Sequence, residues 1–429
     1  MRGSNDDIAV QMDELLARLF PICRSITGNG VRKTLAILKE YIPLEAHEVA
    51  SGTRAFDWTV PKEWNIRDAY IKGPGGRKFA EFATNNLHVM NYSIPIRAKM
   101  SLSELRPHLH SLPNQKDLIP YKTSYYEPGW GFCITHRELE SLEEGEYEVC
   151  IDSTLDDGSL TYGELYLKGA IKDEVLLSCY VCHPSMANDN TSGIALLTFL
   201  AQHLAKTNHR YSYRFLFVPE TIGALVWLSK NKKKVSHIRH GLVVTCVGDN
   251  GPFTYKKSRN GNAEIDRIVT KILADSDVLH EVIDFFPYGS DERQYCSPGF
   301  NLPVGSLMRT MYYRFPQYHT SGDDLNLVKG EYLADTLDVY KKVIGALEYS
   351  ITYKRTNPYG EPQLGKRGLY ANTGGQRPSE ASRQAIAWVL NFSDGFHSLL
   401  DIALRSKLAF ADIKQAADIL LKHELIKSV

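Results

Sequence analysis

The chain has 429 residues, of which 43% are hydrophobic and 23% charged, and its formal net charge at pH 7 is zero. This length is too great for one ordinary domain, so two or three domains are expected. The balanced charge argues against a general binder of nucleic acids or membrane surfaces, because both partners select a basic excess. The sequence contains no run of 18 or more apolar residues, so we expect no membrane-spanning helix.

The seven cysteines are scattered without the spacing of a disulfide framework. This pattern is typical of free thiols in a reducing compartment. Residues 1–10 lack the charged and then apolar layout of a secretory signal. These features together predict a cytoplasmic protein.

The first 60 residues predict two helices. Apolar side chains follow helical spacing over residues 8–19, and this helix ends before Pro21. A turn at residues 28–30 leads into a second helix, which ends near Pro43. Prolines, glycines and aromatic residues then become frequent and apolar runs become short, which is typical of a small β-rich unit. We predict that this unit, residues 61–160, is an insertion into the main domain.

Strands and helices alternate after the insertion. Buried strands are predicted over residues 175–181, 215–218 and 242–247, and helices over residues 194–204, 224–228, 265–273 and 333–351. Alternation of this kind predicts an α/β fold, with a mixed and largely parallel sheet between layers of helices. Ligands of such sheets gather at the carboxyl ends of the strands. We assign residues 1–60 and 161–356 to this domain.

A stretch rich in proline and glycine, residues 357–375, separates a C-terminal segment from the rest. Its three short helical patterns cover residues 382–391, 398–405 and 410–423. They predict a small winged-helix domain over residues 366–429. The last helix, in the position of a recognition helix, has only Lys414 and Lys422 as basic residues, with two aspartates beside them. This charge pattern fits a protein-docking module at least as well as a DNA-binding one.

The stretch richest in chemically capable side chains begins where the predicted strand over residues 175–181 ends. It contains His183 and, six residues later, Asp189 in a turn that includes Gly193. Imidazole and carboxylate are ligands that zinc accepts, and this spacing lets both converge on one ion. The alternative is that His183 and Asp189 only cap a strand and a helix. This stretch alone fits both interpretations.

Three further positions bring candidate ligands to the same edge of the sheet. Glu220 and Asp249 each follow a buried strand, and His319 lies in a loop before the long helix. We expect the nearby carboxylate of Asp323 to orient the ring of His319. A metal site explains these placements together, whereas capping roles require three independent coincidences.

Cys179 and Cys182 have the CxxC spacing of redox and zinc motifs. Positions three apart on an extended strand point to opposite faces, so the two thiols are not expected to chelate together. We interpret both as buried apolar cysteines.

The order of the motifs resembles the zinc aminopeptidase and glutaminyl cyclase superfamily. The motifs are, in order, His183, Asp189-Asn-Thr-Ser-Gly, Glu220-x-x-Gly, Asp249, Ser-Asp291 and Tyr-His319-Thr-x-x-Asp323. More closely, the chain resembles bacterial aminopeptidase-like proteins that have an inserted β domain and a C-terminal winged helix and are often associated with polysaccharide biosynthesis. The resemblance covers nearly the whole chain and implies a zinc-peptidase-like sheet.

The resemblance implies a role for each site residue. His183, Asp189, Asp249 and His319 match metal ligands, with Asp189 in the position that bridges two metals. Glu220 matches the general base. Zinc would then polarise a carbonyl and lower the pKa of its bound water. Glu220 would take a proton from that water and deliver it to the leaving amine.

The segment over residues 288–295 is expected to form a wall of the pocket. Asp291 matches a Ser-Asp position of the superfamily. Glu292 and Arg293 are candidates to bind an amine or carboxylate of the substrate. A surface ion pair between these two residues is the favoured alternative.

Two departures from the superfamily pattern bear on the number of metal ions. Ser185 stands where the superfamily usually has an aspartate behind the first histidine, and Thr221 stands where it has a glutamate ligand. With that ligand absent, we expect one zinc ion rather than two.

The ligand set of this ion stays open at the level of sequence. One set combines His183 and Asp189 with Asp249, and an equally plausible set combines them with His319. In a third arrangement Glu220 is itself a ligand.

We therefore expect a zinc-dependent hydrolase that acts on a small peptide, aminoacyl or other amide-bearing substrate. One alternative is glutaminyl-cyclase-like acyl transfer on a single zinc. Another is a non-catalytic scaffold, stabilised by metal and linked to polysaccharide biosynthesis. Glu220 favours catalysis, because a structural zinc site needs no glutamate beside an open coordination position.

Overall fold

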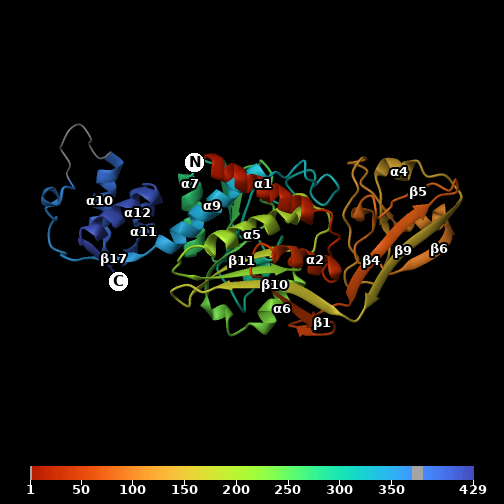
Figure 1. Ribbon diagram of the computed structural model, residues 1–429, viewed down its shortest axis with the longest axis horizontal. Helices are drawn as coiled ribbons and strands as arrows, with labels where there is room; N and C mark the ends of the chain where they lie inside the picture. The colour runs from red at the N-terminus through yellow and green to blue at the C-terminus, as the bar shows by residue number, and fades with distance from the viewer. Residues whose placement is uncertain (1, 370–379) are drawn as a thin grey trace. The chain divides into compact units, whose positions relative to one another are not determined.

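The computed structural model describes residues 2–369 and 380–429, so residues 370–375 of the predicted linker lie outside the described residues. The chain divides into two compact units (Figure 1). The first unit comprises Met1–Ala263 and Glu281–Asp338, and the second comprises Glu264–His280 and Val339–Val429. Among the described residues no helix has the length and apolar character needed to cross a membrane.

An eight-stranded mixed sheet forms the centre of the first unit, in the order β1-β10-β12-β11-β13-β16-β14-β15. Its strands are β1 (Glu45–Ala50), β10 (Ser159–Leu167), β11 (Glu174–Tyr180), β12 (Ser212–Val218), β13 (Ile238–Val243), β14 (Phe253–Lys256), β15 (His280–Ile283) and β16 (Val304–Met308). The neighbouring strands β12, β11, β13 and β16 run parallel, and β10 and β14 flank them in antiparallel orientation. The predicted α/β class with a mixed sheet is confirmed.

The central strand β11 determines where the site lies. All seven of its residues are buried, as expected for a strand covered on both faces. It pairs in parallel with β12 on one side and β13 on the other. The carboxyl ends of these three strands therefore lie at the same edge of the sheet.

One predicted strand boundary is wrong. The apolar run over residues 242–247 predicts a strand up to Val247, but β13 ends at Val243. Val244 and Val247 are fully buried although they lie beyond the strand. A run of apolar residues indicates that the segment is buried, but it does not indicate where the hydrogen bonds between strands stop. The apolar run therefore continues past Val243, the last residue of β13.

Helices cover both faces of this sheet, with α1 and α5 on one side and α6 on the other (Figure 1). The helices of the first unit include α1 (Arg2–Leu19), α2 (Asn29–Leu38), α5 (Ser192–Leu204), α6 (Ile222–Lys230) and α8 (Glu292–Tyr295), and α9 (Gly330–Tyr349) begins in this unit and ends in the second. Helix α5 is apolar around nearly its whole circumference because it packs between the sheet and α1.

A second, four-stranded antiparallel sheet follows in the order β5-β4-β9-β6. Its strands are β4 (Glu63–Lys72), β5 (Lys78–Phe79), β6 (Ile96–Ser101) and β9 (Glu146–Asp156). Short elements around the two sheets are β2 (Arg54–Ala55), β3 (Trp58–Thr59), β7 (Leu109–His110), β8 (Phe132–Cys133), α3 (Leu102–Leu105), α4 (His136–Glu140), η1 (Asn86–His88), η2 (Arg106–His108), η3 (Ala187–Thr191) and η4 (Val235–His237). This sheet has a core of its own that includes Ile71, Phe132 and Val149.

The second unit combines helices with a three-stranded antiparallel sheet in the order β18-β17-β19. Its elements are α7 (Glu264–Asp275), β17 (Thr352–Arg355), η5 (Leu364–Arg367), α10 (Glu380–Phe392), β18 (Asp394–Ser398), α11 (Leu399–Ser406), α12 (Phe410–Lys422) and β19 (Ile426–Ser428). A capping box between Ser398 and Asp401 starts α11. On α12 the ammonium of Lys414 pairs with Asp418 at 2.5 Å, which reduces the positive charge that this helix presents.

Candidate metal centre

His183 lies just beyond the carboxyl end of β11, where the chain leaves the sheet. Its main-chain oxygen accepts a hydrogen bond of 2.8 Å from Nε of Arg24, and the same guanidinium donates to Oγ1 of Thr191 at 2.9 Å. Arg24 is only 1% exposed, and burial lowers the pKa of its guanidinium to about 10. Arg24 therefore stays charged at neutral pH and joins the two ends of the loop that carries the site.

Asp189 lies at the centre of this loop and is fully buried. Its peptide bond to Asn190 is cis. Oδ1 accepts a hydrogen bond from the hydroxyl of Tyr180. Oδ2 lies 2.9 Å from Nε2 of His319 and 3.2 Å from Nδ1 of His183. The structure thus brings together three residues that the sequence analysis proposed as ligands.

Two atoms at the centre of this cluster are suited to hold a cation. Oδ2 of Asp189 and Nε2 of His319 are buried and lie 2.9 Å apart, at ion-pair distance. Each of His183, Asp189 and His319 offers a ligand atom within 4.8 Å of the others. This donor set of imidazole nitrogens and a carboxylate oxygen fits zinc.

The charges of the cluster are coupled. Burial alone would raise the pKa of Asp189, but the neighbouring imidazoles of His183 and His319 outweigh burial and hold that pKa below its usual range. Burial likewise opposes a charge on His183, but the carboxylate of Asp189 outweighs it and raises the pKa of the imidazole. A cation that binds here must therefore displace a proton from His183.

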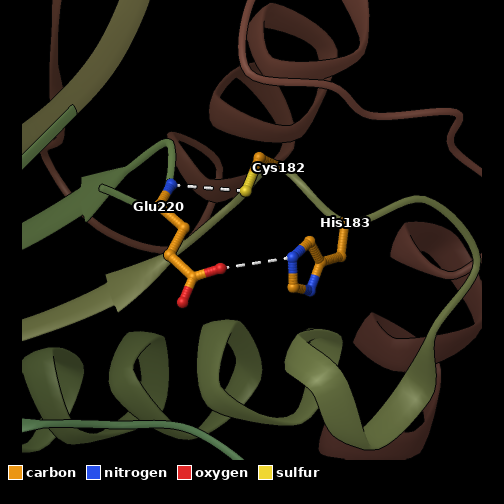
Figure 2. Close-up of side chains that lie close together, drawn as sticks. All are labelled: Cys182, His183 and Glu220. Carbon is orange, nitrogen blue, oxygen red and sulfur yellow. Dashed lines mark hydrogen bonds and ion pairs between the residues drawn. The ribbon is translucent and has the colours of Figure 1, made fainter. Parts of the chain in front are cut away.

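Glu220 lies on the other side of the His183 ring, two residues after β12 ends. Its Oε2 atom is 3.4 Å from Nε2 of His183, and its side chain is 23% exposed. Figure 2 shows the carboxylate turned toward the ring. The two nitrogens of His183 therefore face two different carboxylates, Nδ1 facing Asp189 and Nε2 facing Glu220.

Cys182 also lies at this site, which the sequence analysis did not anticipate. Its Sγ atom accepts a hydrogen bond of 3.3 Å from the main-chain N–H of Glu220 (Figure 2). Sγ and one ligand atom each of His183 and Glu220 lie within 4.8 Å of one another. Burial raises the pKa of the Cys182 thiol to about 12. Strand alternation gave no guidance, because β11 ends at Tyr180 and Cys182 lies beyond it.

The structure does not bring Asp249 into this cluster. Oδ1 of Asp249 accepts hydrogen bonds from Gly251 N at 2.6 Å and Thr310 Oγ1 at 2.7 Å, and Oδ2 accepts one from Asn188 Nδ2 at 2.8 Å. Both oxygens accept hydrogen bonds from the protein, and the predicted role of Asp249 as a metal ligand stays a prediction. Of the two three-ligand sets left open by the sequence, the set with His319 is the one that the structure assembles.

Asp323 does not orient the ring of His319 as expected. Its carboxylate accepts hydrogen bonds from the main-chain N–H groups of Asn188 at 2.6 Å and Asp189 at 2.9 Å. Burial raises the pKa of Asp323 to about 8, and the two N–H donors oppose this rise. The ring of His319 instead stacks on Tyr318, with centroids 3.9 Å apart. Asp323 therefore holds the backbone that presents the Asp189 carboxylate.

A segment from the predicted insertion closes the cluster. The main-chain N–H of Tyr121 donates to the oxygen of His319 at 2.8 Å, and that of Ser321 donates to the oxygen of Ile119 at 2.8 Å. The ring of Tyr121 lies 5.1 Å from that of His319 and 5.3 Å from that of His183. Burial raises the pKa of Tyr121, so its hydroxyl stays neutral and the ring forms a wall of the site.

Asp291 and Arg293 contact the turn that carries Glu220. Oδ1 of Asp291 accepts a hydrogen bond of 2.7 Å from the N–H of Thr221, and Nη2 of Arg293 donates to Oγ1 of Thr221 at 2.9 Å. Thr221 has a φ of 64°, a conformation that a β-branched residue adopts only when its surroundings fix it. These two contacts supply that constraint and so position Glu220.

The favoured surface ion pair between Glu292 and Arg293 is wrong. Oε1 of Glu292 instead pairs with Nζ of Lys256 at 2.6 Å, and both side chains are fully buried. Burial lowers the pKa of Lys256, and Glu292 opposes this effect. Oδ2 of Asp291, Oε2 of Glu292 and Nε of Arg293 are buried without a hydrogen-bond partner among the described residues. Their predicted role in substrate binding stays a prediction.

The chain is similar to known proteins along its whole length. Residues 13–350 match a family model described as a domain of unknown function (DUF4910), and residues 351–428 match a winged helix-turn-helix model. A protein of Clostridium acetobutylicum named "Putative polysaccharide biosynthesis protein with aminopeptidase-like domain" is 56% identical over 415 residues, which cover 97% of this chain and 95% of that protein.

Two solved structures relate the fold to peptidases. A crystal structure of a "putative peptidase" from Clostridium acetobutylicum has a TM-score of 0.95 and 53% identity, and the match covers 100% of this chain and 98% of that chain. A zinc aminopeptidase from Bacillus subtilis has a TM-score of 0.57 and 13% identity, over 78% of this chain and 94% of that chain. At this low identity the second likeness shows the fold alone.

These matches confirm the resemblance to aminopeptidase-like proteins with a C-terminal winged helix. The family match covers most of the chain, and the match with the relative from Clostridium acetobutylicum covers 97% of it. In this chain a domain with an aminopeptidase-like fold is followed by a winged helix-turn-helix domain. The chain therefore belongs to the family described as a domain of unknown function (DUF4910).

Proposed function

We propose that this protein is a zinc-dependent hydrolase of amide or peptide bonds, with one zinc ion held by His183, Asp189 and His319. The observation that supports this proposal is the buried carboxylate oxygen Oδ2 of Asp189, which faces two imidazole nitrogens, Nε2 of His319 at 2.9 Å and Nδ1 of His183 at 3.2 Å. Three protein ligands leave a fourth position open, as in catalytic zinc sites. When bound, zinc supplies Lewis acidity toward a carbonyl oxygen and toward water.

Glu220 is the proposed base. Its carboxylate is partly exposed beside the ligand cluster, so it can take a proton from water and deliver it to the leaving amine. General acid–base catalysis of this kind contributes about 10²–10⁴-fold to a rate. Asp291 and Arg293 hold the Thr221 turn, and through it they keep the Glu220 carboxylate in place.

The proposed substrate is a small molecule with an amide bond, such as a peptide, an aminoacyl compound or an N-acyl sugar. The last class is included because the name of the Clostridium acetobutylicum relative links that protein to polysaccharide biosynthesis. The unpartnered carboxylate oxygen of Asp291 and the Nε donor of Arg293 are suited to a substrate amine and a substrate oxygen respectively. We further propose a cytoplasmic location, and a protein partner rather than DNA at the winged helix.

The test compares Glu220→Gln with the wild-type protein, both purified without added metal. The content of one zinc ion per protein should be unchanged by elemental analysis, because Gln removes the base and not a ligand of the ion held by His183, Asp189 and His319. Hydrolysis in a screen of aminoacyl amides, peptides and N-acyl sugars should fall by about 10²–10⁴-fold. The matched control is Glu127→Gln, since Glu127 is exposed and has no place in the site.

The other outcomes separate the alternative functions. Loss of the ion held by His183, Asp189 and His319 in Glu220→Gln would make Glu220 one of its ligands and remove its proposed role as the base. Amine release with cyclisation instead of water addition would indicate acyl transfer. A wild-type protein that holds zinc but cleaves no amide in the screen would support the scaffold.

A further inference from the structure

The ring of His183 lies between two separate sets of metal-binding atoms. On the Nδ1 side lie Oδ2 of Asp189 at 3.2 Å and, beyond it, Nε2 of His319. On the Nε2 side lie Oε2 of Glu220 at 3.4 Å and Sγ of Cys182. The proposed function uses only the first set as ligands. The second set has a thiol, an imidazole and a carboxylate whose donor atoms are mutually within 4.8 Å.

The surroundings of Cys182 suit a sulfur that binds metal. The main-chain N–H of Glu220 donates a hydrogen bond of 3.3 Å to Sγ, and hydrogen bonds to sulfur are the contacts by which a protein tunes a metal-bound thiolate. The sulfur is also next to the backbone of the glutamate that would share the ion. Figure 2 shows that the side chains of Cys182, His183 and Glu220 lie close together.

The residue after Glu220 is Thr221, and its hydroxyl accepts a hydrogen bond of 2.9 Å from Nη2 of Arg293. Its N–H is engaged by Asp291 at 2.7 Å. Thr221 is therefore turned to structural contacts, and Cys182 is the additional donor that the structure offers on the Glu220 side of His183.

We propose that Cys182 Sγ, His183 Nε2 and Glu220 Oε2 form a second cation position, which shares the His183 ring with the Asp189–His319 position. It accepts divalent ions that bind thiolate, such as zinc, cobalt and cadmium, and not magnesium or calcium, which prefer oxygen ligands. This inference rests on the proposed function only in taking the Asp189–His319 position as the one used for hydrolysis.

Filling the second position changes the state of all three donors. A metal–sulfur bond forms as the thiol proton leaves to solvent, and the His183 ring, bound through both nitrogens, also gives up its proton. The Glu220 carboxylate becomes a ligand and can no longer take a proton from water. Excess zinc would therefore inhibit an enzyme that one zinc ion activates, and the cysteine would set the zinc concentration at which inhibition begins.

The experiment is a titration of the chelator-treated full-length protein with cobalt(II), followed by absorption spectroscopy and by elemental analysis after gel filtration. A cobalt–thiolate bond gives a charge-transfer band in the near ultraviolet, which nitrogen and oxygen ligands do not. The wild-type protein should bind two cobalt ions and show this band. Cys182→Ser should bind one ion and lack the band.

Two further variants keep the test decisive. Cys179→Ser is the matched control, because Cys179 is a buried cysteine on β11, three residues before Cys182, and lies outside both donor sets. It should behave as the wild type. Glu220→Gln retains the thiol but removes the carboxylate, so it should weaken binding of the band-producing ion by at least tenfold. Thermal melting followed by circular dichroism checks that each variant is folded.

The outcomes distinguish this inference from the proposed function. A band that persists in Cys182→Ser, or that is unchanged in Glu220→Gln, overturns the second position. So does a wild-type protein that binds one cobalt ion without any band, and this result leaves the proposed function intact. A wild-type protein that binds no cobalt overturns both.

Discussion

Two buried aspartates at the same edge of the sheet have opposite surroundings. Asp189 follows β11 and Asp249 follows the neighbouring strand β13, and both are almost fully buried. Oδ2 of Asp189 faces two imidazoles, at 3.2 Å and 2.9 Å, which are groups that can bind a metal ion once they have lost a proton. Both oxygens of Asp249 accept hydrogen bonds from protein donors. Position at the edge of the sheet is therefore shared by two carboxylates with different neighbours, imidazoles around Asp189 and hydrogen-bond donors of the protein around Asp249.

The strongest test of this comparison replaces each aspartate by asparagine. Asp189→Asn removes the charge and one donor from the proposed ligand set, so zinc affinity should fall by more than the ~100-fold that loss of a supporting contact costs. Asp249→Asn should retain zinc, because its oxygens serve hydrogen bonds. Elemental analysis after dialysis against a weak chelator measures both. If Asp249→Asn also loses its zinc while it remains folded, Asp249 is a ligand and the comparison fails.

A smaller loss of zinc affinity is expected when the main-chain N–H groups of Asn188 and Asp189 lose the carboxylate of Asp323 as their acceptor. Asp323→Asn leaves one oxygen for the two N–H groups of Asn188 and Asp189, and its amide N–H₂ group faces one of them. Zinc affinity should fall about 10–100-fold, measured by competition with a fluorescent chelator. Asp324→Asn is the control, since Asp324 contacts only its own turn at Asn326. Equal affinities in the two variants would show that Asp323 does not support the site.

The zinc affinity of the proposed site at His183, Asp189 and His319 should also depend on pH. The pKa of His183 is raised in the cation-free protein, so zinc displaces a proton there at neutral pH. Asp189, with its lowered pKa, is already ionised and releases none. The apparent affinity should therefore rise about tenfold per pH unit until the raised pKa of His183 is passed. Calorimetric titration at several pH values checks this, and an affinity independent of pH across the neutral range would contradict it.

The smallest expected effect is a loss of stability when Asp249 loses one of its hydrogen-bond donors. Thr310→Val removes the hydroxyl that donates to Oδ1 of Asp249, while Gly251 N still donates to the same oxygen. The free energy of unfolding should fall by about 1 kcal/mol, measured by urea denaturation, and zinc content should not change. A gain of a second zinc ion in this variant would mean that the hydroxyl alone keeps Asp249 from binding metal.

The order of chemical motifs along the chain predicted the fold class and most of the site. Continuous apolar runs located β11 and β12, because strands buried on both faces have no polar alternation. His183, Asp189 and Glu220 could be identified because they follow strands that end at the same edge of the sheet, and His319 because it lies in a loop before the long helix and completes the order of motifs. This rule depends only on topology, and it places residues without any knowledge of side-chain orientation.

Orientation and contacts between distant elements account for what the sequence did not predict. Asp249 also follows a strand that ends at this edge, but its oxygens accept hydrogen bonds from the side chains of Thr310 and Asn188. These contacts depend on how separate loops pack together, which the sequence does not report. Cys182 was assigned by strand alternation, which stops applying where the strand ends. The ion pair between Glu292 and Lys256 joins residues 36 positions apart, and no local pattern reports it.

The main-chain hydrogen bonds that join Tyr121 to His319 and Ser321 to Ile119 matter to anyone who wishes to trim this protein. A version shortened by deleting residues 61–160 would retain every proposed ligand and the base. The loop that carries His319 would nevertheless lose these two main-chain hydrogen bonds, and both imidazoles would lose the neighbouring ring of Tyr121. Such a shortened protein should release zinc although no proposed ligand has been removed, because the predicted insertion supports the site from the side opposite the sheet.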